Sequence, residues 1–161
     1  MNPRDKLLNK IKSQVDLDTL LICEQSEIVK RFGSLEAFWG LPCPVVEVDE
    51  FFEGIDDENS IAVNLIPHPG IGTFHRTLRG ILTHDGVQNV FIEISRIEKE
   101  DHRPYSERIY ILTSFDEKTL SDWTRVLRPD SLEKSERPVE EVNPFLPRLE
   151  KGCDVYELWW D

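Results

Sequence analysis

Three ionisable side chains near the middle of the chain, His75, Arg79 and Glu93, have the chemistry of a small-ligand site. A guanidinium group can donate two parallel hydrogen bonds to a carboxylate or a phosphate, and an imidazole exchanges a proton near neutral pH. Phe91 would add an aromatic surface beside Arg79. The same residues also fit a simpler arrangement that binds nothing, in which Arg79 pairs with Glu93 and stacks on Phe91.

These side chains would share one face of a long β-hairpin, which we predict for residues 73–97 with its turn at 84–86. Two registers compete. A two-residue turn would pair Leu78 with Glu93, whereas a three-residue loop ending in Gly86 would pair Leu78 with Ile92. We favour the second register, because a slip of one residue exchanges faces and only this register collects the apolar side chains on one face. They are Phe74, Leu78, Leu82, Val90, Ile92 and Ile94.

Several other residues invite a chemical interpretation that their spacing does not support. His68 and His75 could join Asp85 or Glu93 around a metal ion, but their spacing matches no compact ligand pattern, so we predict no metal and no cofactor. Residues 70–72, Gly-Ile-Gly, could hold a phosphate at a helix N-terminus, but the segment that follows is predicted as a strand.

The three cysteines, Cys23, Cys43 and Cys153, are odd in number and far apart. They form no Cys-x-x-Cys pair, so we expect reduced thiols that contribute packing, and a cytoplasmic protein.

An acidic run and two adjacent tryptophans could bind a partner protein. The run comprises Glu53, Asp56, Asp57 and Glu58, together with Glu50, and its spacing does not suit a calcium loop. It is either a surface for a basic partner or a solvated loop. Trp159 and Trp160 could belong to a protein interface or to the core. Because adjacent strand residues point in opposite directions, both outcomes can hold, one for each tryptophan.

Length and charge narrow the class of protein. A chain of 161 residues fits one domain and can bury a core without disulfides. A net charge of −12 argues against nucleic acid and against anionic membrane surfaces, but it suits a basic protein partner. No stretch approaches the roughly 20 apolar residues that a membrane-spanning helix needs.

The remaining pattern predicts an α+β fold: a mostly antiparallel sheet of five to six strands, N-terminal helices, and one C-terminal helix packed on the sheet. Helices are expected at 3–15, 26–32, 35–39 and 116–127, and residues 17–23 fit a helix or a strand. Strands are expected at 45–52, 61–66, in the two arms of the hairpin, at 108–115, and from 155 to the end. Residues 129–161 are expected to form an extended, proline-rich, acidic tail that ends in this last strand.

Three functions remain compatible with the sequence. The first is a non-catalytic acidic interaction protein, such as an inhibitor, an immunity-type protein or a regulatory partner. The second is a small-ligand-binding domain or small enzyme that uses His75, Arg79 and Glu93. The third is a structural subunit joined through the tail. We favour the first, because no catalytic motif accompanies the acidic charge and the aromatic terminus.

Overall fold

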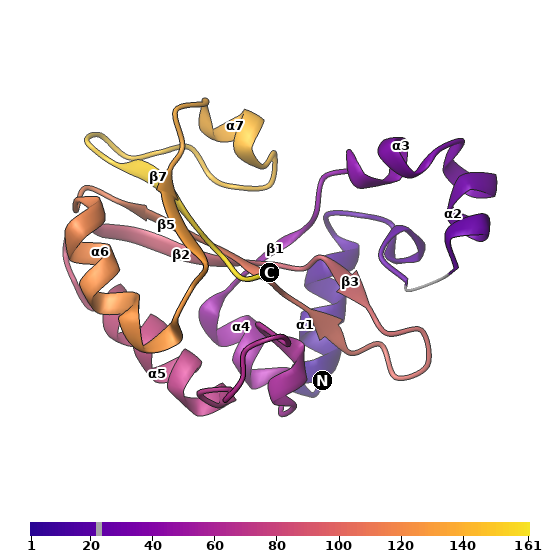
Figure 1. Cartoon of the computed structure of the whole chain (residues 1–161), viewed down its shortest axis with the longest axis horizontal. Coiled ribbons are helices and arrows are strands. Elements are labelled where there is room, and N and C mark those ends of the chain that lie inside the picture. Colours follow the sequence, from indigo (N-terminus) through magenta and orange to yellow (C-terminus); the bar gives the residue numbers. More distant parts are fainter. Residues whose placement is uncertain (22–23) are drawn as a thin grey trace.

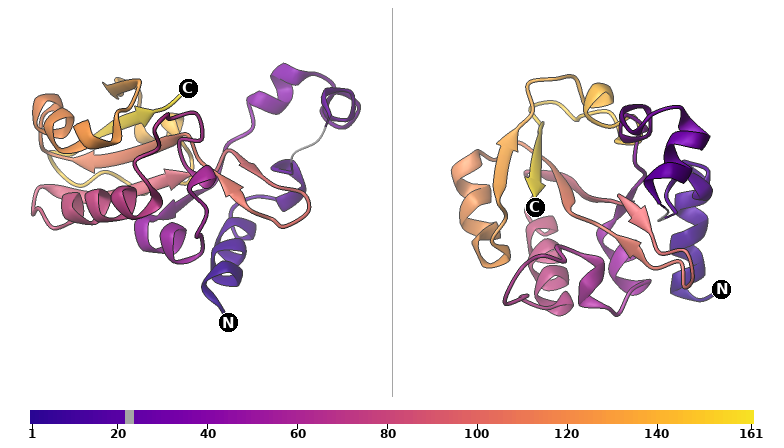
Figure 2. Two further views of the ribbon diagram at one scale, coloured as in Figure 1. Left: turned by 60° about the horizontal axis from the view of Figure 1, so that its bottom comes forward. Right: turned by 45° about the vertical axis from the view of Figure 1, so that its right-hand side comes forward.

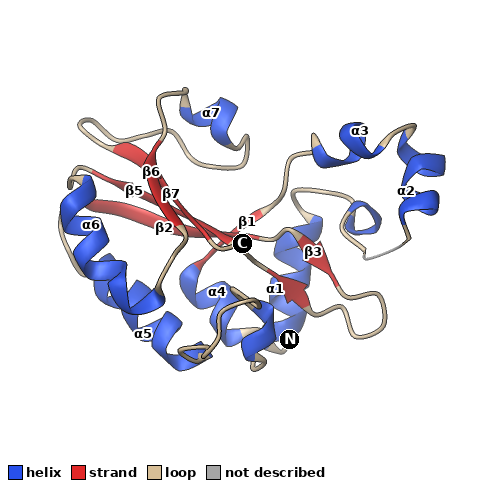
Figure 3. Cartoon of the chain, viewed as in Figure 1, coloured by secondary structure: helices blue, strands red, loops and turns tan. Residues whose placement is uncertain are grey.

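The computed structural model describes residues 1–21 and 24–161, which form an α+β fold (Figure 1, Figure 3). Its main sheet is antiparallel and has five strands in the order β1-β2-β5-β7-β6. In that order they are Val45–Glu47, Val87–Glu93, Arg108–Thr113, Asp154–Trp159 and Ser131–Lys134. A second sheet pairs β3 (Arg96–Ile97) with β4 (Pro104–Tyr105). The predicted α+β class and antiparallel sheet are therefore confirmed.

Seven α-helices are present in the described residues, and four of them, α1, α4, α5 and α6, pack on one face of the main sheet. We call this the helix face. The opposite face, the tail face, is partly covered by α7 and the residues after it. Helices α2 and α3 form an arm that stands away from the sheet (Figure 2). The helices are α1 (Pro3–Lys12), α2 (Gln25–Phe32), α3 (Leu35–Trp39), α4 (Val48–Glu53), α5 (Ile71–Leu82), α6 (Glu117–Thr124) and α7 (Val139–Val142).

The predicted hairpin is wrong in its first arm, because residues 71–82 form helix α5. Phe74, Leu78 and Leu82 are spaced by four, and this spacing keeps residues on one face in both a strand and a helix. The helix also buries Ile81, which alternation would have placed on the opposite face. The second arm is a strand, β2, but its partners are β1 and β5. No hairpin turn therefore exists at 84–86, where a short connection leads from α5 to β2.

Of two other predicted strands, the one at 45–52 is shorter than predicted and the one at 61–66 does not form. The strand predicted for 45–52 ends at Glu47, where α4 begins. The cause is a capping box, in which Glu50 Oε1 accepts a 2.9 Å hydrogen bond from the amide of Glu47 and the Glu47 carboxylate caps the first turn in return. Residues 61–66 form no strand and contribute a single bridge, from Ile61 to Ser106.

The segment predicted as helix or strand at 17–23 contains a 3₁₀ turn at Leu17–Thr19 and a bridge from Leu21 to Ile97. Ile22 and Cys23 lie outside the described residues.

Residues 129–161 contain strand β6 and helix α7 as well as the predicted final strand, β7, and the irregular chain between α7 and β7 packs on the tail face. Strand β7 lies between β5 and β6 and pairs with both. Directly after it, Trp160 is only 2% exposed, and its indole N–H donates a 2.8 Å hydrogen bond to the Leu127 carbonyl. Its ring also packs edge-on against Phe74 of α5. Trp160 is therefore a core residue.

Both faces of the central strands are buried at their middle positions, which explains the unbroken apolar runs at 90–92 in β2 and 109–112 in β5. On β2, Val90 and Ile92 face the helices, whereas Phe91 faces the tail together with Tyr110. Among the described residues, no helix combines the length and the apolar character of a membrane span.

Candidate functional site

The structure separates the four residues of the predicted sheet-face site into two groups. His75 and Arg79 lie one turn apart on α5, where both approach the same carboxylate. His75 Nε2 is 2.9 Å and Arg79 Nε is 3.5 Å from Asp49 Oδ1. The His75 ring also stacks on Phe52, with centroids 4.8 Å apart. These contacts join α5 to α4 on the helix side of the molecule.

Phe91 and Glu93 belong to the opposite, tail face of the sheet. Phe91 is buried in the cluster that contains Tyr110 and Leu146, and Glu93 accepts a hydrogen bond from the Tyr110 hydroxyl. The misassigned strand explains the separation, because α5 covers the helix face and so carries His75 and Arg79 away from Glu93. A site that combines His75, Arg79 and Glu93 does not form.

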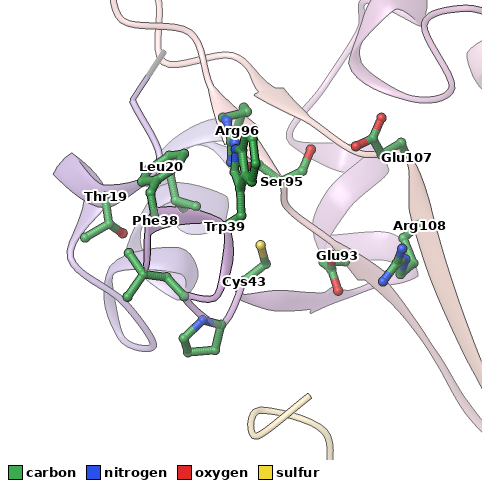
Figure 4. Close-up of a pocket in the computed structure, with 12 residues that line it drawn as sticks. Thr19, Leu20, Phe38, Trp39, Cys43, Glu93, Ser95, Arg96, Glu107 and Arg108 are labelled. Atoms are coloured by element: carbon green, nitrogen blue, oxygen red, sulfur yellow. The ribbon is translucent and has the colours of Figure 1, made fainter. Parts of the chain in front are cut away.

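Glu93 instead lines a cleft where the arm meets the end of the sheet (Figure 4). This first cleft has a volume of about 160 Å³. Figure 4 shows Trp39 on one side, Glu93 and Arg108 on the other, and Cys43 between them. The lining residues are Thr19, Leu20, Phe38, Trp39, Leu41, Pro42, Cys43, Glu93, Ser95, Arg96, Glu107 and Arg108.

The carboxyl group of Glu93 is held in a largely dry environment. Desolvation by the surrounding protein raises the pKa of Glu93, and the hydrogen bond from Tyr110 and the nearby charge of Arg108 offset this rise only in part. Burial and the neighbouring Glu93 charge likewise raise the pKa of Tyr110. Tyr110 therefore stays protonated and acts as the donor in this pair.

The thiol of Cys43 lies in the same environment. Burial, followed by the negative charge of Glu93, raises the pKa of Cys43 to about 12. Because the thiolate is the nucleophilic form, Cys43 is inert at neutral pH. Its backbone carbonyl accepts a 2.8 Å hydrogen bond from the side chain of Asn143, which joins the tail to the base of the arm.

Arg108 links the first cleft to a second one on the same sheet face. Its Nη1 atom lies 3.8 Å from Glu157 Oε1. Burial lowers the pKa of Arg108, but the nearby carboxylates of Glu93 and Glu157 outweigh this effect, so that the pKa is raised. The second cleft has a volume of about 360 Å³ and is lined by Arg108, Ser131, Glu133, Glu157 and Trp159. We call the two together the double cleft.

The double cleft carries more acid than base. Its four carboxylates are those of Glu93, Glu107, Glu133 and Glu157, and its two guanidinium groups are those of Arg96 and Arg108. Arg96 is already engaged, because its guanidinium lies 4.5 Å from the centre of the Phe38 ring and donates to the Ser95 carbonyl. At the arm end, Trp39 is 61% exposed, and at the other end Trp159 is partly exposed.

The acidic run proposed for partner binding lies elsewhere, between α4 and the 3₁₀ turn Glu58–Ser60, and lines neither half of the double cleft. Glu53, Asp56 and Glu58 are exposed. Asp57 has a structural role, since it caps that turn through the Asn59 amide and pairs with Arg103. These two interactions hold the pKa of Asp57 below its ordinary value.

The structure also bears on the metal site and the phosphate site considered from the sequence. Within the described residues, no three histidine, cysteine or acidic side chains gather as a metal site would require. Gly70, with φ of 95°, precedes helix α5, so the predicted strand that argued against a phosphate site at 70–72 is wrong. His68 Nδ1 accepts a 2.9 Å hydrogen bond from the Gly70 amide, which helps to fix the start of α5.

Sequence reasoning selected Glu93 and Trp159 but missed Tyr110, Arg108, Trp39 and Asn143. A signal existed for two of them, because Arg108 and Tyr110 are two residues apart on a predicted strand and therefore had to share a face.

Neither the curated proteins nor the solved structures include a match to this chain. A family model does match most of the chain, over residues 23–158. The protein therefore belongs to the family described as "Uncharacterized protein YfbO family".

Proposed function

We propose that this protein is a non-catalytic interaction protein that binds a basic partner protein at the double cleft. The observation that carries the proposal is an exposed aromatic side chain, Trp39, at one end of a double cleft whose four carboxylates outnumber its two guanidinium groups. Tryptophan is enriched among the residues that dominate protein interfaces, and complementary charge speeds encounter and selects partners. A net charge of −12 would attract a basic protein over a longer range.

The ionisable groups support binding more than catalysis. The Cys43 thiol stays protonated at neutral pH, and Tyr110 is committed to its hydrogen bond with Glu93. The two arginines are held by Phe38 and Glu157. Such a network fixes the shape and charge of a surface, which is what recognition requires.

A second candidate function is the binding of a small ligand in the first cleft alone. It is favoured by the desolvated carboxyl group of Glu93, because ionisable groups with shifted pKa values concentrate at functional sites. Its weakness is size, since a pocket for a small molecule usually encloses about 300–1,000 Å³. At about 160 Å³, the first cleft suits one side chain of a larger partner better.

The thiols and the net charge bear on the compartment of the protein and on the class of its partner. We infer a reducing compartment such as the cytoplasm, supported by the free thiols of Cys43 and Cys153. The negative charge supports a protein partner over nucleic acid, whose phosphates require a basic surface.

The test compares the unmodified chain with Trp39→Ala as baits for basic proteins, followed by titration of each captured protein in purified form. We expect a basic protein that binds the unmodified chain and loses most of its affinity for Trp39→Ala. Val126→Ala is the matched control, because Val126 is also exposed but lies outside the double cleft. Equal binding to all three baits would place the interface elsewhere.

A further inference from the structure

We propose that the first cleft is an anchor for a single arginine side chain of the partner, with its guanidinium group paired to Glu93 and its stem against Trp39. The inference rests on the proposed function and specifies the chemistry that the site recognises. Four observations support it: the size of the cleft, the state of its charges, its exposed aromatic wall and the desolvation of Glu93.

The size of the cleft suits a long, narrow group. Its volume of about 160 Å³ is too small for a typical small-molecule ligand, but one extended side chain can enter it. The rim on the arm side consists of Trp39 and Leu41, which are 61% and 38% exposed. Arginine buries its methylene stem along apolar surface of this kind while its charged end reaches further.

Two of the four charged groups lining the cleft are carboxylates with which a cation can pair. Two carboxylates, Glu93 and Glu107, and two guanidinium groups, Arg96 and Arg108, line the cleft. Arg96 is engaged by the Phe38 ring, and Arg108 lies between Glu93, whose charge acts on it, and Glu157 at 3.8 Å. Among the described residues, neither Glu93 nor Glu107 has a cation within ion-pair distance, and the hydrogen-bond donors to Glu93, Tyr110 and Asn143, are neutral. An incoming cation therefore meets two carboxylates that can still accept hydrogen bonds from it.

Arginine fits this arrangement better than an anion or a neutral group. Its methylene stem can pack against Trp39 while its guanidinium group donates to a carboxylate, which combines two attractive interactions. A carboxylate from a partner would instead approach Glu93 and Glu107 and be repelled. A neutral amide would leave Glu93 desolvated and without an opposite charge beyond that of Arg108.

The pairing also predicts a dependence on pH. The groups that face Glu93 are Tyr110 and Arg108 from β5, Glu157 from β7, and Cys43, Arg96 and Glu107 at the cleft. Burial raises the pKa of Glu93 above its ordinary value, so this carboxyl group becomes neutral at a higher pH than an ordinary glutamate does. Because only ionised Glu93 pairs with a cation, binding should release a proton from the protonated form. Affinity should therefore rise with pH until Glu93 of the free protein is fully ionised.

The experiment titrates the full-length chain with three capped tripeptides that place arginine, glutamine or glutamate between two glycines. The indole N–H signal of Trp39, assigned with Trp39→Phe, reports on the first cleft by NMR. We expect a saturable shift with the arginine peptide alone. Glu93→Gln should weaken that binding by about tenfold or more, because it removes the charge and keeps the shape. Glu140→Gln, which changes an exposed carboxylate outside the double cleft, is the matched control and should leave the affinity of the arginine peptide unchanged.

A second measurement keeps the proposal testable if Glu93→Gln folds poorly: the affinity of the unmodified chain for the arginine peptide across mildly acidic to neutral pH. A constant affinity, an equal response to the glutamine peptide, or preferential binding of the glutamate peptide would each overturn the arginine anchor. If the arginine peptide fails while the captured partner still depends on Trp39, the anchor is wrong and the interaction surface stands. If the arginine peptide binds through Glu93 but partner capture ignores Trp39, the proposed function is wrong instead.

Discussion

The side-chain amide of Asn143 donates a 2.8 Å hydrogen bond to the backbone carbonyl of Cys43, so residues far apart in the chain meet beside Glu93. Asn143 is buried, and its Oδ1 accepts a hydrogen bond from the Phe145 amide. One side chain thus fixes the turn after α7 and the base of the arm at the same time. The first cleft depends on this link, because Cys43 forms part of its lining.

Asn143→Ala should therefore destabilise the protein by about 1–3 kcal/mol, the cost of leaving a buried polar group without its partner. Urea denaturation followed by tryptophan fluorescence measures the change in the free energy of unfolding. Glu140→Ala, an exposed substitution on α7, is the control and should change stability by no more than about 0.5 kcal/mol. Equal stability of the two variants would mean that water replaces the Asn143 amide.

Glu93 makes a prediction about pH and stability. Its pKa is raised in the folded protein, chiefly by desolvation, so the folded state holds the proton more tightly than the unfolded state does. Between the ordinary pKa of a glutamate, about 4.3, and the higher folded value, the contribution of this group to stability falls as pH rises. Below this window, with Glu93 protonated in both states, the penalty is absent.

Glu93→Gln removes this ionisation and can retain the hydrogen bond from Tyr110. We expect the free energy of unfolding of the variant, relative to the unmodified chain, to increase as pH rises through this window. The difference between the two pH profiles is the relevant quantity, since other acids titrate in the same range. A difference that stays constant with pH would show that Glu93 is solvated in the folded protein.

Sequence-based prediction succeeded where the signal was local. Three predicted helices form close to their expected starts, where side-chain caps fix the first turn: Asn2 accepts from Asp5, Ser34 from Ala37, and Asp116 from Thr119. Such caps need only neighbouring residues. The main error, in α5, arose because apolar residues spaced by four satisfy both a strand and a helix.

Prediction failed where the signal was tertiary. Strand β6 consists of Ser131, Leu132, Glu133 and Lys134, which show no strand-like pattern, and it forms because β7 lies beside it. The candidate site failed for the same reason. Glu93 was selected as a partner of His75 and Arg79 in the predicted hairpin, but its actual neighbours follow from the pairing of β2 with β5, which sequence spacing does not fix.

Gln14 closes one edge of the sheet and provides the third prediction. Its Nε2 donates to the Val45 carbonyl at 2.7 Å, and its Oε1 accepts from the Val45 amide at 2.9 Å. Side-chain amide and backbone thus pair as a neighbouring strand would. This arrangement covers the outer edge of β1, which would otherwise be available for pairing with another chain.

Gln14→Ala should lower the free energy of unfolding by about 1–3 kcal/mol, for two hydrogen bonds of about 0.5–1.5 kcal/mol each. It should also promote self-association through the uncovered edge, which sedimentation velocity detects as a shift toward larger species. Lys12→Ala, an exposed substitution near the end of α1, is the control and should alter neither property. Loss of stability without association would mean that other features protect this edge.

The C-terminal strand provides the last prediction. Deletion of residues 153–161 removes β7, which lies between β5 and β6, together with the buried side chains of Val155, Leu158 and Trp160. Each large apolar side chain contributes roughly 1.5–3 kcal/mol on burial, and the total stability of a domain is only about 5–15 kcal/mol. We therefore expect the shortened chain to show no cooperative thermal transition.

Trp160→Phe is the graded control for this deletion, because it keeps an aromatic ring against Phe74 but removes the donor to the Leu127 carbonyl. It should fold and lose about 1–3 kcal/mol, the cost of a buried acceptor left unpaired. Differential scanning calorimetry distinguishes the two variants by the presence of a transition. A shortened chain that melted at the temperature of the full chain would mean that β5 and β6 are stable without the strand between them. In that case the sheet would owe its stability to the helix face, where Phe74, Leu78 and Ile81 of α5 pack beneath β2.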